Sequence, residues 1–220
     1  MNYRNDIIQL SKEWWDLKVA KVSGTRFGQL TSSQENMMLD EMANEALDGF
    51  ILPDDFENED VNYGRENEPV ALDLLEKETG LKFDRGGVIV SELHPNIHMA
   101  SPDGITPDRK IIAEVKCTMD GKRQINRFRC GVEKKNLPQI INYFAVSPEV
   151  EKVIWASYCG FRPELPLVVY EFTRETIIEV KEYKTKENVI ITIQDKVNEG
   201  LAKLPNLESE LKQLIDKIKF

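Results

Sequence analysis

The sequence has few of the residues that most often bind zinc or form disulfides. Its 220 residues include two histidines and three cysteines, Cys117, Cys130 and Cys159. The cysteines are widely spaced and form no CxxC pair, which excludes a zinc finger and a disulfide framework and is typical of a reducing compartment. Their dispersal also gives no support for an iron–sulfur cluster.

Long apolar segments, repeats and nucleotide-binding loops are absent as well. No uninterrupted hydrophobic run approaches the roughly 20 residues that a membrane-spanning helix needs. The first residues, Met1 to Asp6, are too polar to lead a secretory signal, so we expect a cytoplasmic protein without membrane association. No P-loop appears, and no unit of 20–50 residues repeats, which excludes a solenoid. With 41% hydrophobic and 30% charged residues, the composition is that of a globular protein.

The charge is unevenly distributed, although the net charge is −9. Residues 27–64 contain no Lys or Arg, and residues 53–62 within them predict a solvated acidic loop. Residues 109–135 reverse the balance, because only Glu114, Asp120 and Glu133 oppose a set of basic residues: Arg109, Lys110, Lys116, Lys122, Arg123, Arg127, Arg129, Lys134 and Lys135. This stretch is either a solvated basic loop or a surface that faces a phosphate backbone.

The apolar periodicity predicts a mixed α/β (α+β) fold, a central mixed sheet flanked by helices, in one domain spanning residues 1–220. A helical N-terminal part covers 1–80, a sheet core covers 81–172, and a helical C-terminal part covers 173–220 with Pro205 separating two segments. Within the first part, Trp14 and Trp15 belong to a helix ending near residue 20, and a second helix starts around residues 23–25. A third helix is expected to start from a capping box at Ser32 and Glu35 and to run to about residue 48. The other expected helices are 66–79, closed by Gly80, and 137–146. Strands are expected at 87–93, 98–100, 110–117, 152–159 and 167–172.

Three charged residues of the sheet core form a candidate catalytic set. Glu114 and Lys116 share one face of a strand because side chains alternate, and burying both is costly unless they serve a site. Pro102-Asp103-Gly104 predicts a turn, and the short segment up to Lys110 predicts a hairpin that brings Asp103 beside Glu114. Two carboxylates can hold Mg²⁺, and a lysine can orient a water for phosphodiester hydrolysis. The alternative is a surface turn with a salt bridge on an edge strand.

These residues resemble a known family. Asp103, followed by Glu114-Val115-Lys116, is similar to the PD-(D/E)XK nuclease signature, and Ser-Pro-Asp-Gly at 101–104 resembles its lambda exonuclease / YqaJ viral recombinase branch. The segments 63–69, 137–143 and 14–25 also resemble marks of that branch: a helix with an additional acid, a Gln-bearing helix, and a Trp–basic–hydroxyl segment.

The resemblance implies a restriction-endonuclease-like core and a Mg²⁺-dependent 5′→3′ exonuclease acting on linear double-stranded DNA. Such enzymes leave 3′ single strands for phage-type recombination by strand annealing. They hold two metal ions per active site, and we expect Mn²⁺ to substitute for Mg²⁺. The resemblance also implies a homotrimeric ring around DNA, a single-strand annealing protein as partner, and the host cytoplasm for a phage-encoded chain.

The resemblance further implies residue roles. Asp103, Glu114 and the Val115 carbonyl would bind metal, with Glu68 supporting the second ion or its water. Lys116 would be the catalytic lysine, and Gln139 would position the nucleophile or the phosphate. The expected DNA and 5′-phosphate contacts are Lys18, which stands where lambda exonuclease has arginine, Thr25, Arg26, Trp14 and Tyr143.

The sequence leaves alternative functions and residue roles open. A site- or structure-specific endonuclease would use the same chemistry, and a DNA-end-binding recombination scaffold would need no catalysis. One of the adjacent tryptophans Trp14 and Trp15 is expected in the core, while the other could stack against a DNA end. His94 and His98 flank Pro95, and we expect both in a turn between strands.

Overall fold

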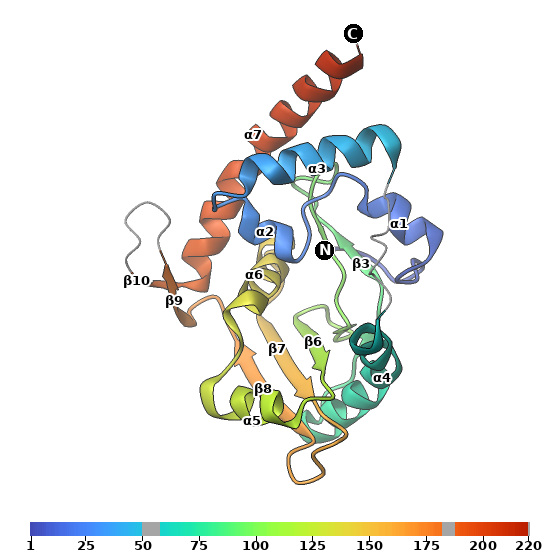
Figure 1. Ribbon diagram of the computed structural model, residues 1–220, viewed down its shortest axis with the longest axis vertical. Coiled ribbons are helices and arrows are strands. Elements are labelled where there is room, and N and C mark those ends of the chain that lie inside the picture. Colours follow the sequence, from blue (N-terminus) through green and yellow to red (C-terminus); the bar gives the residue numbers. More distant parts are fainter. Residues whose placement is uncertain (50–57, 182–187, 220) are drawn as a thin grey trace.

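A five-stranded mixed sheet forms the centre of the fold (Figure 1). This computed structural model describes residues 1–49, 58–181 and 188–219. The strands follow the order β2 (Asp84–Arg85), β5 (Gly104–Ile105), β6 (Ile111–Cys117), β7 (Lys152–Tyr158) and β8 (Leu167–Phe172). β6 and β7 are parallel, and the other neighbouring pairs are antiparallel. Since β6 lies between two partners, its residues are held in a fixed register.

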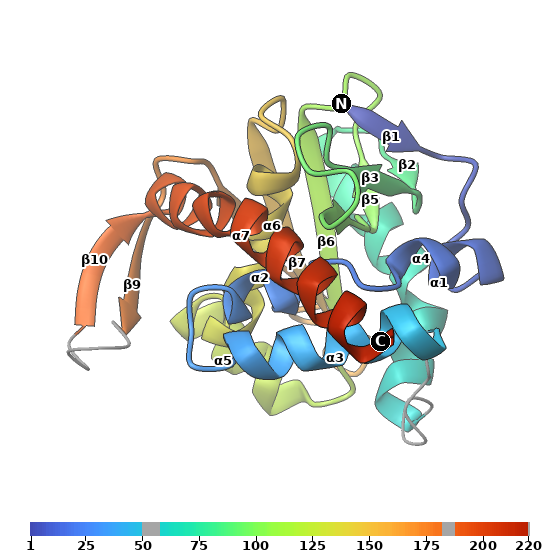
Figure 2. The same ribbon diagram turned by 90° about the horizontal axis from the view of Figure 1, so that it is seen from above.

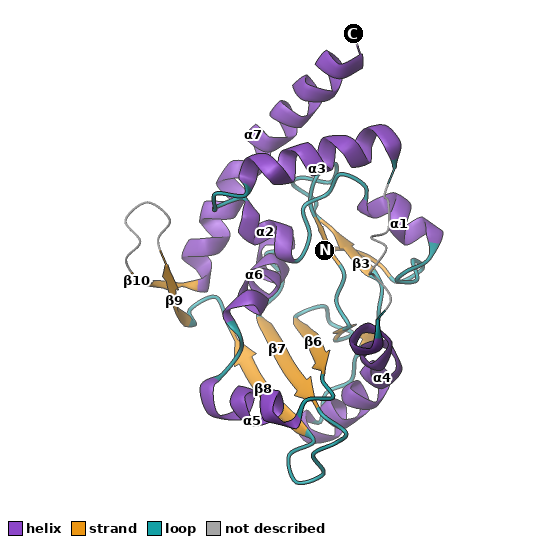
Figure 3. Cartoon of the chain, viewed as in Figure 1, coloured by secondary structure: helices purple, strands orange, loops and turns teal. Residues whose placement is uncertain are grey.

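Helices pack on both faces of this sheet (Figure 3). α4 (Glu59–Thr79) covers one face, where Leu72 and Leu75 bury against Ala113 and Val115 of β6. α6 (Leu137–Val146) covers the other face, where its apolar side chains join Ile112 in the largest core cluster. The alternation of side chains along β6 thus places Glu114 and Lys116 on the α6 side.

A second sheet supports the N-terminal part of the chain. It contains β1 (Asn2–Arg4), β3 (Val88–Val90) and β4 (Met99–Ala100), all antiparallel. α1 (Lys12–Lys18) lies against it because Trp14 is buried with Val88, Val90 and Met99. One of the two tryptophans joins the core as expected: Trp14 is buried, whereas Trp15 is half-buried.

The remaining elements surround α6 and the far edge of the central sheet. α2 (Thr25–Gln29) and α3 (Glu35–Asp48) pack beside α6 and α7 (Ile193–Lys219). The hairpin of β9 (Ile177–Lys181) and β10 (Asn188–Thr192) projects from the body near the start of α7 (Figure 2). α5 (Gly121–Cys130) lies over β7 and β8, and a 3₁₀ turn, η1 (Lys134–Asn136), leads into α6. Among the described residues, no helix is long and apolar enough to cross a membrane.

The expected fold class, a mixed central sheet flanked by helices, is confirmed. The predicted ranges 137–146 and 167–172 match α6 and β8, Gly80 ends α4 in the left-handed conformation, and the hairpin after Asp103 pairs β5 with β6. These elements carry a strong local signal, either apolar periodicity or turn chemistry.

Three local predictions are wrong. Ser32 does not cap α3, because Gln34 is the N-cap residue and the Ser32 hydroxyl accepts the Gln34 N–H at 3.2 Å. Residues 59–62 of the predicted acidic loop form the first turn of α4, which Asn58 caps, while residues 50–57 lie outside the described residues. The C-terminal part contains the strands β9 and β10, and Pro205 lies inside α7 instead of dividing it.

The turn predicted at His94 and His98 is present, and the structure adds the surroundings of the His98 side chain. The chain does turn between His94 and His98, as expected, with the His98 N–H bonded to the His94 carbonyl at 3.0 Å. The His98 side chain, however, is fully buried, and its Nε2 lies 2.8 Å from Asn142 Oδ1 on α6. Apolar neighbours such as Phe27 surround it, which a turn position does not reveal.

Candidate active site

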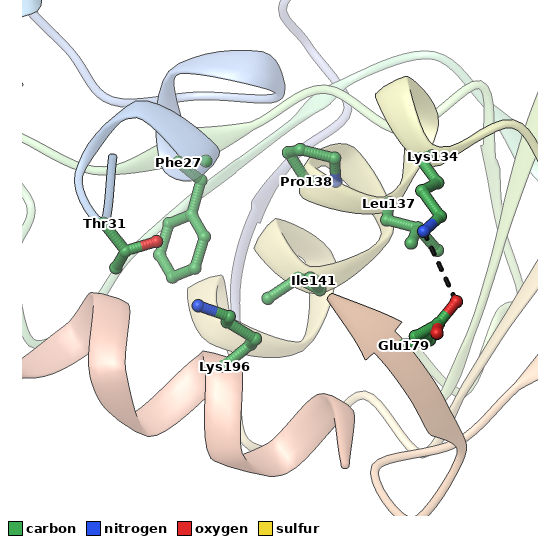
Figure 4. A pocket seen from close by; sticks show the side chains of 9 residues that line it. Phe27, Thr31, Lys134, Leu137, Pro138, Ile141, Glu179 and Lys196 are labelled. Atoms are coloured by element: carbon green, nitrogen blue, oxygen red, sulfur yellow. Dashed lines mark ion pairs between the residues drawn. The ribbon is translucent and has the colours of Figure 1, made fainter. Parts of the chain in front are cut away.

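Two cavities differ sharply in chemistry. A polar cavity of about 270 Å³ is lined by most of the predicted site residues: Trp14, Lys18, Asp103, Glu114, Lys116, Gln139 and Tyr143. A smaller cavity of about 200 Å³ lies between α2, α6 and α7 and is lined mainly by apolar groups such as Phe27 and Ile141. Its one carboxylate, Glu179, pairs with Lys134 (Figure 4). The polar cavity is therefore the candidate active site.

Asp103 is held against the central strand by a hydrogen bond. It ends the loop before β5, and its Oδ2 accepts the backbone N–H of Val115 at 2.6 Å. The turn at Pro102-Asp103-Gly104 makes this contact possible, because Gly104 pairs with Ala113 and packs so closely on Phe83 that a Cβ would lie 2.9 Å from it. The loop carboxylate and the Glu-x-Lys segment are thus brought together by strand pairing.

Glu114 is the most deeply buried of the acids, with 1% of its surface exposed. One carboxylate oxygen, Oε1, forms an ion pair with Lys116 and receives no hydrogen bond. The other oxygen, Oε2, accepts a hydrogen bond from the Tyr143 hydroxyl, for which the Ser101 carbonyl is a second acceptor at 3.1 Å. Gln139 Nε2 in turn donates to the Tyr143 oxygen at 3.2 Å. α6 therefore orients Glu114 through Tyr143.

Burial and neighbouring negative charge raise the pKa of two acids, Asp103 and Glu68. Burial raises the pKa of Asp103 well above its usual value, and the charges of Glu114 and Glu68 add to the effect. Burial also raises the pKa of Glu68, followed by the charge of Glu114. Burial opposes the charged form of Lys116, but Glu114 and Asp103 outweigh it and raise the pKa of its ammonium. The site concentrates negative charge, which a cation would relieve.

Glu68 lies at the margin of this arrangement. It is half-buried on α4, and the residues that line the polar cavity do not include it. Its charge nevertheless acts on Asp103, Glu114 and Lys116. Within the described ranges, no three His, Cys, Asp or Glu side chains are close enough to hold a metal ion together. Glu68 would have to move toward Asp103 and Glu114 for all three to share ions.

The donor set of Asp103 and Glu114 fits a hard divalent cation. Both contribute carboxylate oxygens, which Mg²⁺ prefers, and Glu114 Oε1 is buried with no hydrogen-bond donor of its own. Val115 can contribute only its backbone carbonyl, since its side chain is buried under α4. The Lys116 ammonium lies next to Glu114.

Lys18, which also lines the cavity, packs its ammonium against two tryptophan rings. Lys18 Nζ lies 4.5 Å from the ring centre of Trp14 and 5.2 Å from that of Trp15. Trp14 is fixed by a hydrogen bond from Nε1 to Ser101 Oγ at 2.9 Å. Burial lowers the pKa of Lys18, with the nearby charge of Arg26 adding to the effect. A phosphate would find here a positive charge held in place by packing.

One predicted phosphate contact, Arg26, is not brought to the cavity. The Arg26 guanidinium binds Glu45 through two hydrogen bonds and the Lys21 carbonyl through a third. Glu45 also accepts the Ala20 N–H at 3.0 Å, so this pair holds the segment between α1 and α2 on α3. Thr25 is the first residue of α2, but its side chain lies outside the described part of the structure.

Sequence reasoning missed several residues that line the cavity: Gln9, Ser23, Gly24, Ser101 and Asn142. Gln9 donates to the Pro102 carbonyl at 2.8 Å, next to Asp103. Asn142 is fixed on both sides, since it donates to the Met99 carbonyl at 3.0 Å and pairs with His98. Asn142 directly precedes Tyr143, and Ser101 lies two positions before Asp103, so their sequence neighbours could have indicated both as site residues. No sequence feature indicated Gln9.

Comparison with known structures identifies shared architecture. An alkaline exonuclease, LHK-Exo, from Laribacter hongkongensis superposes with a TM-score of 0.70 at 23% identity, covering 95% of this chain and 98% of that one. Its complex with dAMP gives a TM-score of 0.71 at 22% identity over the same shares. A phage-related exonuclease from Haemophilus somnus 129PT gives 0.59 at 15% identity, covering 90% and 96%. At these identities the similarity establishes the fold.

A search among curated proteins found no match. The sequence profile of the YqaJ-like viral recombinase domain, in contrast, matches residues 13–149, which is more than half of the chain and includes the whole of the polar cavity apart from Gln9. The chain belongs to the YqaJ-like viral recombinase domain family.

Proposed function

We propose that this protein is a Mg²⁺-dependent exonuclease that degrades linear double-stranded DNA from the 5′ end and leaves 3′ single strands for recombination by strand annealing. The observation that carries the proposal is the convergence of Asp103, Glu114 and Lys116 on one polar cavity, with Asp103 bonded to the backbone of the strand that bears the other two. Membership in a recombinase family and the fold shared with alkaline exonucleases support the same activity.

The chain's own residues would divide the work as follows. Asp103, Glu114 and the Val115 carbonyl would hold the metal, with Glu68 completing a second site, and Tyr143 would keep Glu114 in place. The bound metal would neutralise charge on the phosphate and acidify the attacking water. Lys116 would orient that water, and Gln139 would contact the water or the phosphate.

A 5′-phosphate would bind at the Lys18 end of the cavity. The ammonium supplies the charge, and Ser23 and Gly24 form the neighbouring wall. Because Lys18 is a point charge, this contact would tolerate more than one phosphate orientation. Arg26 would act indirectly, since its bonds to Glu45 and to the Lys21 carbonyl hold the segment that carries Lys18 and Ser23.

An end-labelled linear duplex, incubated over time with and without Mg²⁺, tests the proposal directly. We expect release of 5′ nucleotides that requires Mg²⁺ or Mn²⁺ and that Asp103→Ala and Glu114→Ala abolish. Asp108→Asn serves as a control because this exposed acid lies in the same hairpin, between β5 and β6. Hydrolysis that survives both alanine variants would show that the assigned residues are wrong.

Closed circular DNA separates the alternatives. An exonuclease needs an end and leaves a supercoiled plasmid intact, whereas an endonuclease of the same superfamily would nick or linearise it. A protein that binds DNA ends without hydrolysing any substrate would be the non-catalytic recombination scaffold. Light scattering on the purified protein tests the proposed trimeric ring independently of activity.

A further inference from the structure

The positive charge of residues 109–135 is concentrated on one helix. Six of the nine basic residues in this stretch form ion pairs: Arg109, Lys110, Lys116, Arg127, Lys134 and Lys135. The other three, Lys122, Arg123 and Arg129, form no salt bridge with any described residue, and all three are exposed on α5. In a chain with a net charge of −9, α5 thus carries positive charge with no acidic residue in the helix to balance it.

The amphipathic pattern of α5 is inverted. Its buried positions are the polar Gln124 and Arg127, whereas Ile125 is 45% exposed and Phe128 is 61% exposed. Packing does not account for an aromatic side chain on the outer face of a helix whose inner face is polar. Exposed aromatic and cationic side chains side by side are the composition of surfaces that bind single-stranded nucleic acid.

The inner face of α5 is fixed by a buried network. Gln124 Nε2 donates to the Ser157 carbonyl at 3.0 Å, and the Ser157 hydroxyl donates to Gln124 Oε1 at 2.6 Å. Arg127 Nη1 donates to the same hydroxyl at 2.8 Å, and its Nε pairs with Glu133. These bonds anchor α5 to β7, so the outer face is a rigid surface that loses little entropy on binding.

A shallow apolar hollow adjoins the exposed aromatic residue. It has a volume of about 470 Å³ and is lined by Phe128, by β8 residues such as Leu167 and Val169, and by Glu78 at its acidic edge. Unpaired bases could lie in this hollow while their phosphates face the basic residues of α5. A duplex, whose bases are stacked inside, would use the charges but not the hollow.

The surface is adjacent in sequence to the proposed catalytic strand. Only residues 118–120 separate the end of β6 from the start of α5, and Figure 1 shows α5 beside the lower ends of β7 and β8. Asp120, the last of these three residues, caps α5: its Oδ1 accepts the Lys122 N–H at 2.8 Å. α5 is thus joined to the proposed catalytic strand by a short connection.

We propose that the outer face of α5, formed by Lys122, Arg123, Ile125, Phe128 and Arg129, together with the adjoining hollow, binds single-stranded DNA. Its ligand would be the strand that remains after degradation of the complementary strand, and in this respect the inference rests on the proposed function. The basic residues contact phosphates, and Phe128 stacks on an unpaired base.

Fluorescence anisotropy with a labelled single-stranded oligothymidylate, measured on the full chain without divalent metal, tests this surface. Replacing Lys122, Arg123 and Arg129 together by alanine should weaken binding about tenfold or more and lower the slope of log K against log salt by about 2, for three lost phosphate contacts. Phe128→Ala should weaken single-strand binding about fivefold or more while leaving duplex binding unchanged. All four positions are exposed, so thermal unfolding should stay as in wild type.

The matched control removes equal charge from the same stretch. Replacing Lys110, Lys134 and Lys135 by alanine should leave the salt slope unchanged, because their partners Glu151, Glu179 and Glu133 already neutralise them. Equal slopes for the two triple variants would overturn the inference and leave α5 as a surface for another class of partner. A greater loss of duplex than of single-strand affinity would also overturn it.

These outcomes are independent of hydrolysis. Normal DNA degradation by a chain whose α5 variants bind like wild type would refute this inference alone. Loss of single-strand binding on α5 in a chain that hydrolyses nothing would refute the proposed exonuclease and keep the binding surface.

Discussion

The hydrogen bond between Tyr143 and Glu114 provides a sharp test of how the proposed metal site is built. Tyr143→Phe removes one hydroxyl from a fully buried ring and leaves its volume almost unchanged. Glu114 Oε2 then loses its donor, and Gln139 Nε2 loses its acceptor. The variant therefore perturbs orientation and solvation of the carboxylate without opening a large cavity.

The magnitude follows from burial. A hydrogen bond to a charged acceptor contributes about 1.5–3 kcal/mol, and Glu114 is 1% exposed, so water cannot replace the lost donor. We expect a loss of about 2 kcal/mol in the free energy of unfolding, or about 4–8 °C in Tm for a chain of this size. A group that orients a metal ligand affects metal affinity or activity by about 10- to 100-fold, so the Mg²⁺ concentration for half-maximal activity should rise at least about tenfold.

Two measurements and one control make the test decisive. Calorimetric titration with Mn²⁺ measures metal affinity without turnover, and urea unfolding measures stability. Tyr63→Phe is the control, since it removes a hydroxyl that accepts the Gly160 N–H at 3.1 Å near the surface and should cost about 1 kcal/mol or less without changing metal affinity. A Tyr143→Phe protein with wild-type stability and wild-type Mn²⁺ affinity would refute the argument that α6 positions Glu114.

Three further predictions concern single side chains. Burial lowers the pKa of His98 to about 4, below its unfolded value of 6.5. His98 therefore contributes stability that is complete above pH 6.5 and is lost as pH falls toward 4, by about 3 kcal/mol in all. Urea unfolding at several pH values should show this dependence in wild type and His94→Gln but not in His98→Gln. Lys18→Ala should abolish the preference for 5′-phosphorylated over 5′-hydroxyl ends in initial-rate assays while Lys12→Ala keeps it, and an unchanged preference would contradict the assignment of Lys18. Lys116→Ala should lower kcat far more than DNA affinity, because the lysine acts mainly on the transition state; comparable losses in kcat and DNA affinity would point to a binding role. Ca²⁺ in place of Mg²⁺ should permit DNA binding but little cleavage.

The parts of the site that follow from local rules could be predicted from the sequence. Strand alternation put Glu114 and Lys116 on one face, and the Pro-Asp-Gly turn put Asp103 beside them; the structure adds the bond from Val115 N–H to Asp103. The bounds of α6 followed from its apolar residues and from Pro138 in its first turn.

The parts of the site that depend on long-range contacts could not be predicted from the sequence. Tyr143 was expected to contact DNA, yet it lies on Glu114, 29 positions away, because α6 packs on β6. Arg26 was expected at a phosphate, but its partner Glu45 comes from the acidic stretch on α3, whose position relative to α2 is a tertiary feature. α5 was missed because Gln124 and Arg127 occupy its buried face, so apolar periodicity gives no helical signal there.

The hydrogen bond from the Val115 N–H to Asp103 links correct pairing of the hairpin to formation of the proposed metal site. The same carboxylate that would bind metal also fastens its loop to the backbone of the central strand, so a hairpin that slips by one residue loses its pairing and its metal ligand in one event. If the proposed function holds, a chain with a slipped hairpin would not hydrolyse DNA, and a newly made chain would gain this activity only after the sheet has formed.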